Sequence, residues 1–263
     1  MTSRFVLEWD YTELASTYSL RPPYAPAAID RIAGACGQRR RLLAADIGAG
    51  TGHLTLDLLD RGCRVDAVEP NDAMRAIGIE RTSGRTGVAW SVGIGEKTGL
   101  PSRRYDLVTY GSSFSNTDQP RALLETWRVL RPGGRFACIW NHRDLEDPLQ
   151  AEIEALIRAR VPTYTYGRRR QDHASVIEES ELFGDVVKIE EPVRYEVPIS
   201  DWMAAWRSHA TLKRQAAADF LPIVDAIEHL VHDRVGGKEL VVPYTTVGWL
   251  AQLRPDAAVS APT

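Results

Sequence analysis

The chain has 263 residues, of which 44% are hydrophobic and 25% charged, a composition typical of a globular protein with a sizeable core. Its formal net charge of −3 argues against binding to nucleic acid or to an anionic membrane surface. The three cysteines lack the spacing of a zinc site or a disulfide framework, so we expect reduced thiols. We expect neither a signal peptide nor a membrane span, because no apolar run approaches the roughly 20 residues that a span needs. These features predict a soluble, cytoplasmic protein.

The first 140 residues alternate between helical and strand patterns. Residues 1–40 predict a helical cover that is interrupted around Arg21-Pro22-Pro23. The predicted strands span residues 41–46, 64–69, 87–92, 105–111 and 134–140. The predicted helices between them span residues 52–61, 71–82 and 119–130, and Pro132-Gly133-Gly134 is expected to stop the last one. Short apolar strands separated by helices indicate a parallel sheet covered on both faces, so the predicted fold class is α/β.

The second half of the chain predicts the remaining strands and a helical cap. Helices are expected at 147–160 and near 174–182, and a strand pair at 185–197 and 239–248. A helical insertion at about 200–237 separates the two strands and is closed by Gly236-Gly237. We therefore expect an N-terminal cover at 1–40, a core at 41–140, strands with the cap at 141–253, and a disordered tail at 254–263.

The stretch LLAADIGAGTGHLTLDLL, residues 42–59, predicts a cofactor-binding turn between a strand and a helix. Its glycines stand on alternate positions, and His53 occupies the last slot of the dinucleotide pattern G-x-G-x-x-G. Asp46 beside the turn would repel a pyrophosphate, whereas it suits an ammonium or sulfonium group. Glu69, about 20 residues past the glycines, can accept both hydroxyls of a ribose, which by itself still allows NAD.

Four motifs in the same order carry a resemblance to a known family: DIGAGTG, VEPNDAM, GEKTGLPSRRYDLVTYG and ETWRVLRPGGRFACIW. Together, over about residues 41–140, they resemble the class I S-adenosylmethionine-dependent methyltransferases. YSLRPPY near the N-terminus resembles the cover of the small-molecule branch, which includes ubiquinone and trans-aconitate methyltransferases. The resemblance implies a Rossmann-like, seven-stranded sheet of order 3-2-1-4-5-7-6 with strand seven antiparallel, S-adenosylmethionine as cofactor, and no metal.

The resemblance also implies which residues bind the cofactor. Those implied at or near the methionine end are Tyr18, Arg21, Asp46, Gly48, Ala49, Gly50, Gly111 and Ser112, with Arg21 pairing the carboxylate. Those implied at or near the ribose and the adenine are Glu69, Pro70, Met74, Ile94, Gly95 and Glu96. Many relatives have an aspartate at or next to position 94, so we expect the backbone or Glu96 to read the adenine here. Taken singly, the glycines could serve only a tight turn, and Met74 only the core.

His142, just past the fifth predicted strand, is the candidate general base, with a solvent-exposed turn histidine as the alternative interpretation. A base is needed only for an acceptor that is protonated at neutral pH. Many relatives carry His-Trp after strand four, but Ser115 and Asn116 stand there instead. Tyr18 and Tyr24 are alternative groups for orienting the acceptor. His53 is expected only to border the cofactor.

Aromatic residues in the second half predict the walls of a substrate pocket. The predicted pocket residues are Tyr24, Ser115, Trp140, Tyr164, Tyr166, Trp202, Trp206 and His209. A core stripe is the alternative for any one of the aromatic residues. Arg168, Arg169 and Arg170 form a short basic run, which we interpret as a solvated loop, with contact to an acidic substrate as the alternative.

These features predict methyl transfer to a small molecule, with oxygen of a natural product as the expected acceptor atom. Nitrogen and carbon acceptors remain open, as does a cyclase or isomerase that binds S-adenosylmethionine without transferring its methyl group. A nucleic-acid or protein methyltransferase is disfavoured by the acidic balance. A nicotinamide oxidoreductase is disfavoured by His53 and Asp46. We expect no nucleic-acid or membrane partner, and a monomer or homodimer.

Overall fold

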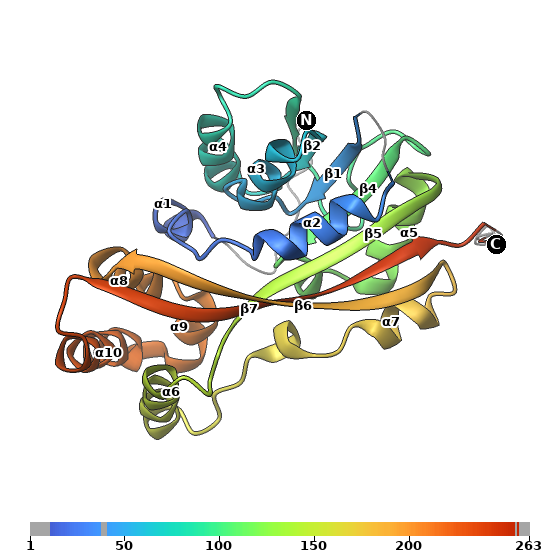
Figure 1. Ribbon diagram of the computed structural model, residues 1–263. Coiled ribbons are helices and arrows are strands. Elements are labelled where there is room, and N and C mark those ends of the chain that lie inside the picture. Colours follow the sequence, from blue (N-terminus) through green and yellow to red (C-terminus); the bar gives the residue numbers. More distant parts are fainter. Residues whose placement is uncertain (1–10, 38–40, 256, 258–263) are drawn as a thin grey trace.

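The protein is described by a computed structural model, which covers residues 11–37, 41–255 and 257. The first ten residues of the expected cover and most of the expected tail lie outside this part. A seven-stranded sheet of order β3-β2-β1-β4-β5-β7-β6 occupies the centre (Figure 1). Its strands are β1 (Leu43–Ile47), β2 (Arg64–Val68), β3 (Val88–Ser91), β4 (Tyr105–Gly111), β5 (Leu130–Arg143), β6 (Phe183–Pro198) and β7 (Glu239–Leu253). β7 is antiparallel to both of its neighbours, and β1 to β5 are parallel. The predicted fold class, strand order and direction are therefore confirmed.

The helices follow the predicted alternation closely in the first half. They are α1 (Ala15–Tyr18), α2 (Pro26–Gly34), α3 (His53–Asp60), α4 (Asp72–Arg81), α5 (Gln119–Val129), α6 (Pro148–Arg160), α7 (Ala174–Glu179), α8 (Ile199–Arg207), α9 (Ala210–Ala216) and α10 (Phe220–Arg234). Side chains of Asn71, Asp118 and Asp147 accept hydrogen bonds from backbone N–H groups in the first turns of α4, α5 and α6. These caps explain why the three helices begin where they do.

Two apolar layers cover the sheet, because its strands bury side chains on both faces. In β5, Phe136, Cys138 and Trp140 pack with α5 and α7, while Ala137 and Ile139 pack with α2 and α3. This period-two alternation is what a strand with two buried faces requires. The two layers fix the core and hold the carboxyl ends of the parallel strands at one edge.

β5 is longer than the predicted strand at 134–140. It begins at Leu130, directly after α5, and continues to Arg143. Its pairing with β4 shifts register between Leu130 and Arg135, so the Pro-Gly-Gly segment is accommodated at an irregularity within the strand. His142 consequently lies inside β5, where it pairs with Thr245, and not in a turn past the strand.

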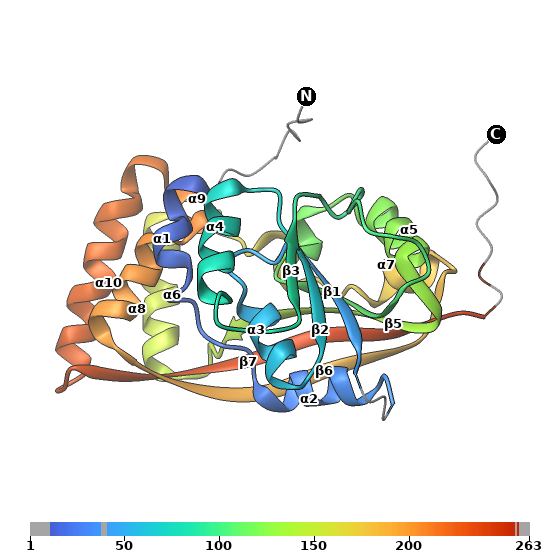
Figure 2. The same ribbon diagram turned by 90° about the horizontal axis from the view of Figure 1, so that it is seen from above.

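β6 and β7 extend beyond the core and carry the cap. Figures 1 and 2 show α8, α9 and α10 grouped with α6 at one end of this long strand pair. A third apolar cluster fills the cap, with Trp202 and Met203 of α8, Ile153 of α6 and Ile223 of α10 packed on Val242 of β7. Among the helices of the described residues, none is long and apolar enough to cross a membrane.

The N-terminal segment joins the core to the cap. α1 contacts α4 on one side and α8 on the other, and Figure 2 shows it between them. Asn141 of β5 donates hydrogen bonds from Nδ2 to the carbonyl oxygens of Pro22 (3.0 Å) and Pro23 (2.8 Å). The Ala25 amide donates to Thr246 Oγ1 at 2.7 Å. These contacts hold the segment across the carboxyl edge of the sheet.

Candidate functional site

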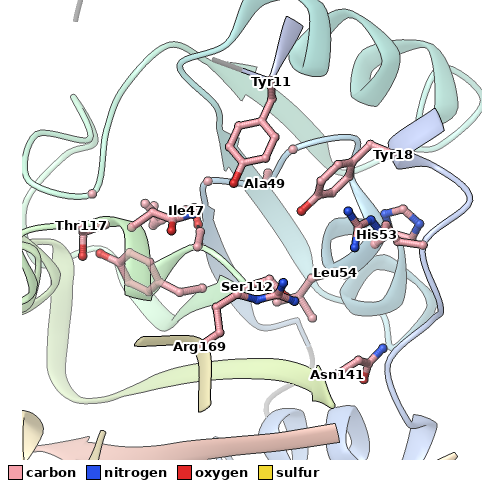
Figure 3. A pocket seen from close by; sticks show the side chains of 18 of the residues that line it. Tyr11, Tyr18, Ile47, Ala49, His53, Leu54, Ser112, Thr117, Asn141 and Arg169 are labelled. Atoms are coloured by element: carbon pink, nitrogen blue, oxygen red, sulfur yellow. The ribbon is translucent and has the colours of Figure 1, made fainter. Parts of the chain in front are cut away.

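A cavity of about 830 Å³ lies at the carboxyl edge of the parallel strands, beneath the N-terminal segment and the cap. This volume is near the upper end of the roughly 300–1,000 Å³ range of ligand pockets, which suits a site for two molecules. Every residue that the resemblance implied for the cofactor lines this one cavity. Figure 3 shows its walls, with Ala49 from the glycine turn, Tyr11 and Tyr18 from the N-terminal segment, and Asn141 from β5.

The glycine turn after β1 requires glycine by its backbone conformation. Gly48, Gly50 and Gly52 have φ values of +66°, +58° and +83°, which favour residues without a Cβ. A Cβ on Gly48 would also lie 2.5 Å from the Cβ of Ser113. The turn is tied to β2, because Gly48 and Ala49 both donate to the Val68 carbonyl. A bare backbone surface therefore faces the cavity.

Two buried carboxylates stand beside this turn. Glu69 accepts from the Gly50 amide through Oε2 and from the Asn71 amide through Oε1, both at 2.8 Å. Burial raises the pKa of Glu69, and these two backbone hydrogen bonds oppose the shift. Asp46 accepts from the hydroxyls of Thr55 (2.7 Å) and Thr109 (3.2 Å), and burial raises its pKa to about 6. Carboxylates held in this way can bind hydroxyl or cationic groups of a ligand.

A third part of the cavity is formed by α4 and by the loops after β3 and β4. Met74, buried in the first turn of α4, lies beside Gly50, and Ile94 and Gly95 line the same cavity. Glu96 accepts from the Asp118 amide at 2.6 Å, which joins the two loops. An apolar side chain beside backbone amides and a carboxylate is an arrangement that can receive a heteroaromatic base.

The N-terminal segment places aromatic and cationic groups over the cavity. Tyr11 and Tyr18 pack edge to face, with ring centroids 5.8 Å apart. The Arg21 guanidinium lies 5.2 Å from the centroid of the Tyr18 ring and donates to the Ser208 carbonyl at 2.8 Å. Among the described residues, its buried Nε finds no hydrogen-bond partner. His53 lines the cavity as well, with Nε2 3.1 Å from the Ser19 carbonyl.

His142 lines the cavity from β5. Its Nε2 donates to the Arg169 carbonyl at 2.9 Å, which leaves Nδ1 as the proton acceptor. Burial is the main cause that lowers the pKa of His142, to about 4. The ring is therefore neutral at pH 7 and is a weaker base than an ordinary histidine. Beside it in the cavity lining, Tyr24 and Ser112 pair their hydroxyls at 3.0 Å, and Ser112 has a φ of +59°.

The structure brings most of the predicted pocket aromatic residues together. Tyr24, Tyr166, Trp202, Trp206 and His209 all line the cavity. Trp206 stacks on His209 with ring centroids 5.1 Å apart, and His209 Nδ1 accepts from the Leu212 amide. The remaining nitrogen of His209, Nε2, therefore carries the proton and is a donor.

Three predicted pocket residues, by contrast, are not among those that line this cavity. Trp140 is fully buried in the sheet core and stacks on His173, because the alternation of β5 turns it toward α7. Tyr164 is buried in the cap cluster. Ser115, in the short 3-10 helix Phe114–Asn116, is also buried, with an unpartnered Oγ.

The arginine run is the main feature that the sequence interpretation placed differently. The 3-10 helix Gly167–Arg170 carries all three arginines, which line the cavity, and of the three only Arg168 is exposed. The cavity is also lined by four residues that the sequence did not predict, from the N-terminal segment, β5 and β7: Tyr11, Asn141, Arg143 and Tyr244. For Arg143 a signal was available, because it follows the carboxyl end of the predicted strand at 134–140, where ligand sites of such sheets lie. No group of His, Cys, Asp or Glu side chains within the described ranges is placed to hold a metal ion.

Comparisons with known proteins agree with this geometry. Residues 45–138 match the methyltransferase domain family. An uncharacterized methyltransferase of Mycobacterium tuberculosis (strain ATCC 25618 / H37Rv) is 41% identical over 124 residues, 47% of this chain and 48% of the relative. A ubiquinone/menaquinone biosynthesis C-methyltransferase of Methylobacterium nodulans is 36% identical over 107 residues, 38% of this chain and 42% of the relative. The chain spans about half or less of the length of these curated relatives.

Among solved structures, a putative type II methyltransferase from Anaeromyxobacter dehalogenans superposes with a TM-score of 0.60. The match covers 89% of this chain and 98% of the other, at 22% sequence identity. At this identity the likeness concerns the fold. At this coverage it extends beyond the matched family segment, residues 45–138.

Proposed function

We propose that this chain, whose fold and matched segment at residues 45–138 are similar to those of methyltransferases, transfers a methyl group from S-adenosylmethionine to a small molecule. The observation that carries the proposal is that the glycine turn, Asp46, Glu69 and the cap all face one cavity. A cofactor that lies on the turn would thus share an enclosed space with the acceptor.

The residues of the core fit S-adenosylmethionine, which supplies an electrophilic methyl group on a sulfonium when it is bound. Each oxygen of Glu69 takes one backbone N–H and has a lone pair left for a ribose hydroxyl. Asp46 supplies negative charge near a cationic amino acid moiety. The unpartnered Nε of Arg21 is available for its carboxylate. Met74 offers an apolar surface to the adenine.

The acceptor has to lie about 3–3.5 Å from the methyl carbon, in line with the bond that breaks. We assign its place to the space between Ser112, His142 and the cap aromatic residues Trp202 and Trp206. Aromatic walls suit a flat or apolar part of such a molecule. Because the ring of His142 is neutral but weakly basic, an acceptor that needs little proton removal fits best.

The finer assignment is O-methylation of a specialised metabolite, by a cytoplasmic enzyme that acts as a monomer or homodimer. The cavity supports an acceptor of small size. The free thiols of Cys36, Cys63 and Cys138 support a reducing compartment such as the cytoplasm. No nucleic-acid or membrane partner belongs to this proposal. One of the relatives is named as a C-methyltransferase, so the acceptor atom is what the experiment has to identify.

The test is incubation of the purified chain with methyl-labelled S-adenosylmethionine and a panel of small acceptors. The panel contains carboxylic acids, phenols, amines and activated carbon acids. Label that moves onto one acceptor class, with release of S-adenosylhomocysteine, is the expected result. Cofactor binding with an altered substrate but no label transfer would instead indicate a cyclase or isomerase, and would contradict the proposal.

A further inference from the structure

Six arginines line the cavity, of which Arg121 belongs to α5 and pairs with Asp118. The other five are Arg21 of the N-terminal segment, Arg143 of β5, and Arg168, Arg169 and Arg170 of the 3-10 helix Gly167–Arg170. The acidic residues of the lining come instead from the core and its loops: Asp46, Glu69, Glu96 and Asp118. Cations that share one partly enclosed space repel one another, and burial lowers the pKa of Arg21 and of Arg170. Such a cluster is most stable when an anion is bound within it.

Most of these guanidinium groups already have partners within the protein. Arg143 forms an ion pair with Glu154 at 3.2 Å and lies 5.0 Å from the centroid of the Trp206 ring. Arg170 donates to the Arg143 carbonyl and stacks on Tyr166. Arg21 donates to the Ser208 carbonyl. Arg168 reaches the Thr117 carbonyl at 3.5 Å.

Arg169 differs from its neighbours. Within the residues that the structure describes, no hydrogen bond or ion pair is made by its guanidinium group. Its backbone is held firmly, since its carbonyl accepts from His142 Nε2. Figure 3 shows the side chain pointing into the cavity. Its positive charge contributes to lowering the pKa of His142, in β5, and of His209, at the start of α9.

We propose that Arg169 is a specificity-determining residue that binds an anionic group of the methyl acceptor, a carboxylate or a phosphate. The inference rests on the proposed function, in which the methionine carboxylate pairs with Arg21. That pairing uses one cation and leaves the guanidinium of Arg169 free. A guanidinium can hold a carboxylate or a phosphate through two parallel hydrogen bonds. Anchoring at Arg169 would place the acceptor next to His142, whose ring nitrogen bonds the same residue's carbonyl.

The proposal is tested with R169Q, which keeps a polar, hydrogen-bonding side chain but is shorter and carries no charge. R160Q is the matched control, because Arg160 is exposed at the end of α6 and does not line the cavity. The R169Q protein is expected to fold, since no side-chain partner is lost, and its thermal midpoint is compared with that of the wild type. R169K, which keeps the charge but loses the fork, serves as a second variant.

The chain is saturated with S-adenosylhomocysteine and titrated in a calorimeter with citrate in one experiment and with inorganic phosphate in another. The anion that binds identifies the class that the site takes. R169Q should weaken its binding tenfold or more, R169K should weaken it less, and R160Q should leave it unchanged. The affinity for S-adenosylhomocysteine itself should stay within about twofold in R169Q. A neutral citrate triester should not bind.

Two outcomes would overturn the proposal. The first is equal anion binding by R169Q and wild type, or no anion binding by either. The second is a tenfold loss of S-adenosylhomocysteine affinity in R169Q with unchanged affinity for 5′-methylthioadenosine, which would assign Arg169 to the cofactor carboxylate. If S-adenosylhomocysteine does not bind the wild type, the proposed function fails, and the anion titrations repeated on the free chain still decide whether Arg169 binds an anion.

Discussion

Single residues at the turn after β1 explain why this cavity suits a sulfonium cofactor better than a dinucleotide. A pyrophosphate needs backbone amides without nearby negative charge. Here the Gly50 amide is occupied by Glu69, and Asp46 lies buried beside the turn. The charge next to the turn is therefore negative, which disfavours a phosphate and favours a cationic group.

Glu69 gives the most direct prediction at this scale. Glu69→Ala removes the acceptors for both ribose hydroxyls and leaves the Gly50 and Asn71 amides unpaired, so affinity for S-adenosylhomocysteine should fall at least tenfold. Glu69→Gln keeps one carbonyl acceptor and should lose less. Calorimetry measures both, and an unchanged affinity in Glu69→Ala would rule out the ribose role.

His142 gives a second prediction, on the pH dependence of turnover. Because its pKa is lowered to about 4, the ring is already neutral throughout the range from pH 6 to 8. The contribution of His142 to turnover, measured as the ratio of wild type to His142→Ala with saturating S-adenosylmethionine, should therefore be constant over that range and decline only at much lower pH. His142→Ala should reduce turnover about a hundredfold, the low end for a general base.

The control for this experiment is His229→Ala, at an exposed position of α10 outside the cavity. An inflection near the ordinary histidine pKa of 6.5 that is present in the wild type and absent in His142→Ala would contradict the burial of His142, whereas titration of Asp46 would give an inflection in both. A loss of less than a few fold in His142→Ala would exclude it as the base.

At the scale of elements, the N-terminal segment closes the cavity through few but specific bonds. Asn141→Ala removes the hydrogen bonds to the Pro22 and Pro23 carbonyls and the one that Asn141 Oδ1 accepts from Thr246. We expect a cost of about 1–3 kcal/mol in closing the segment, because its carbonyls lose their partners. Hydrogen exchange should speed up around residues 18–25, and affinity for S-adenosylhomocysteine should fall severalfold.

Thr246→Ser keeps the hydroxyl and is the matched control for Asn141→Ala. It should show wild-type exchange, since Ser retains the acceptor for the Ala25 amide. Unchanged exchange in Asn141→Ala would mean that other contacts hold the segment closed.

The sequence predicted the elements of the core well, because each carries a local signal. Alternation of apolar runs and helices placed β1 to β4 within a few residues, and the family motifs supplied the order of the sheet. The residues that form the walls of the substrate pocket were harder to predict, because they depend on the direction in which each side chain points. Trp140 sits on the face of β5 that meets α7, and only the assembled sheet decides which face a strand residue takes. The arginine run reaches the cavity because its 3-10 helix is tied to His142, a contact without any local pattern.

For the whole molecule, buried titratable groups predict how stability depends on pH. Burial lowers the pKa of four of the six histidines: His53, His142, His173 and His209. In the unfolded chain these rings bind protons near 6.5, whereas the folded ones, where a value is resolved, bind them near 4. The stability that they contribute is present above 6.5 and is lost as the pH falls toward 4.

Buried carboxylates act in the opposite direction, since the pKa values of Asp46 and Asp57 are raised from 3.8 to about 6. They take up protons in the folded state and offset part of the histidine effect. The histidines outnumber them, so the free energy of unfolding should be lower at pH 5 than at pH 7, by about 3 kcal/mol. Urea unfolding at the two values checks this, and equal or greater stability at pH 5 would refute it.

The cavity as a whole is assigned to S-adenosylmethionine, and calorimetric titration of the purified chain with S-adenosylhomocysteine and with NAD tests this assignment most directly. The account predicts that S-adenosylhomocysteine binds with one molecule per chain and that NAD does not bind. Binding of NAD without binding of S-adenosylhomocysteine would contradict it.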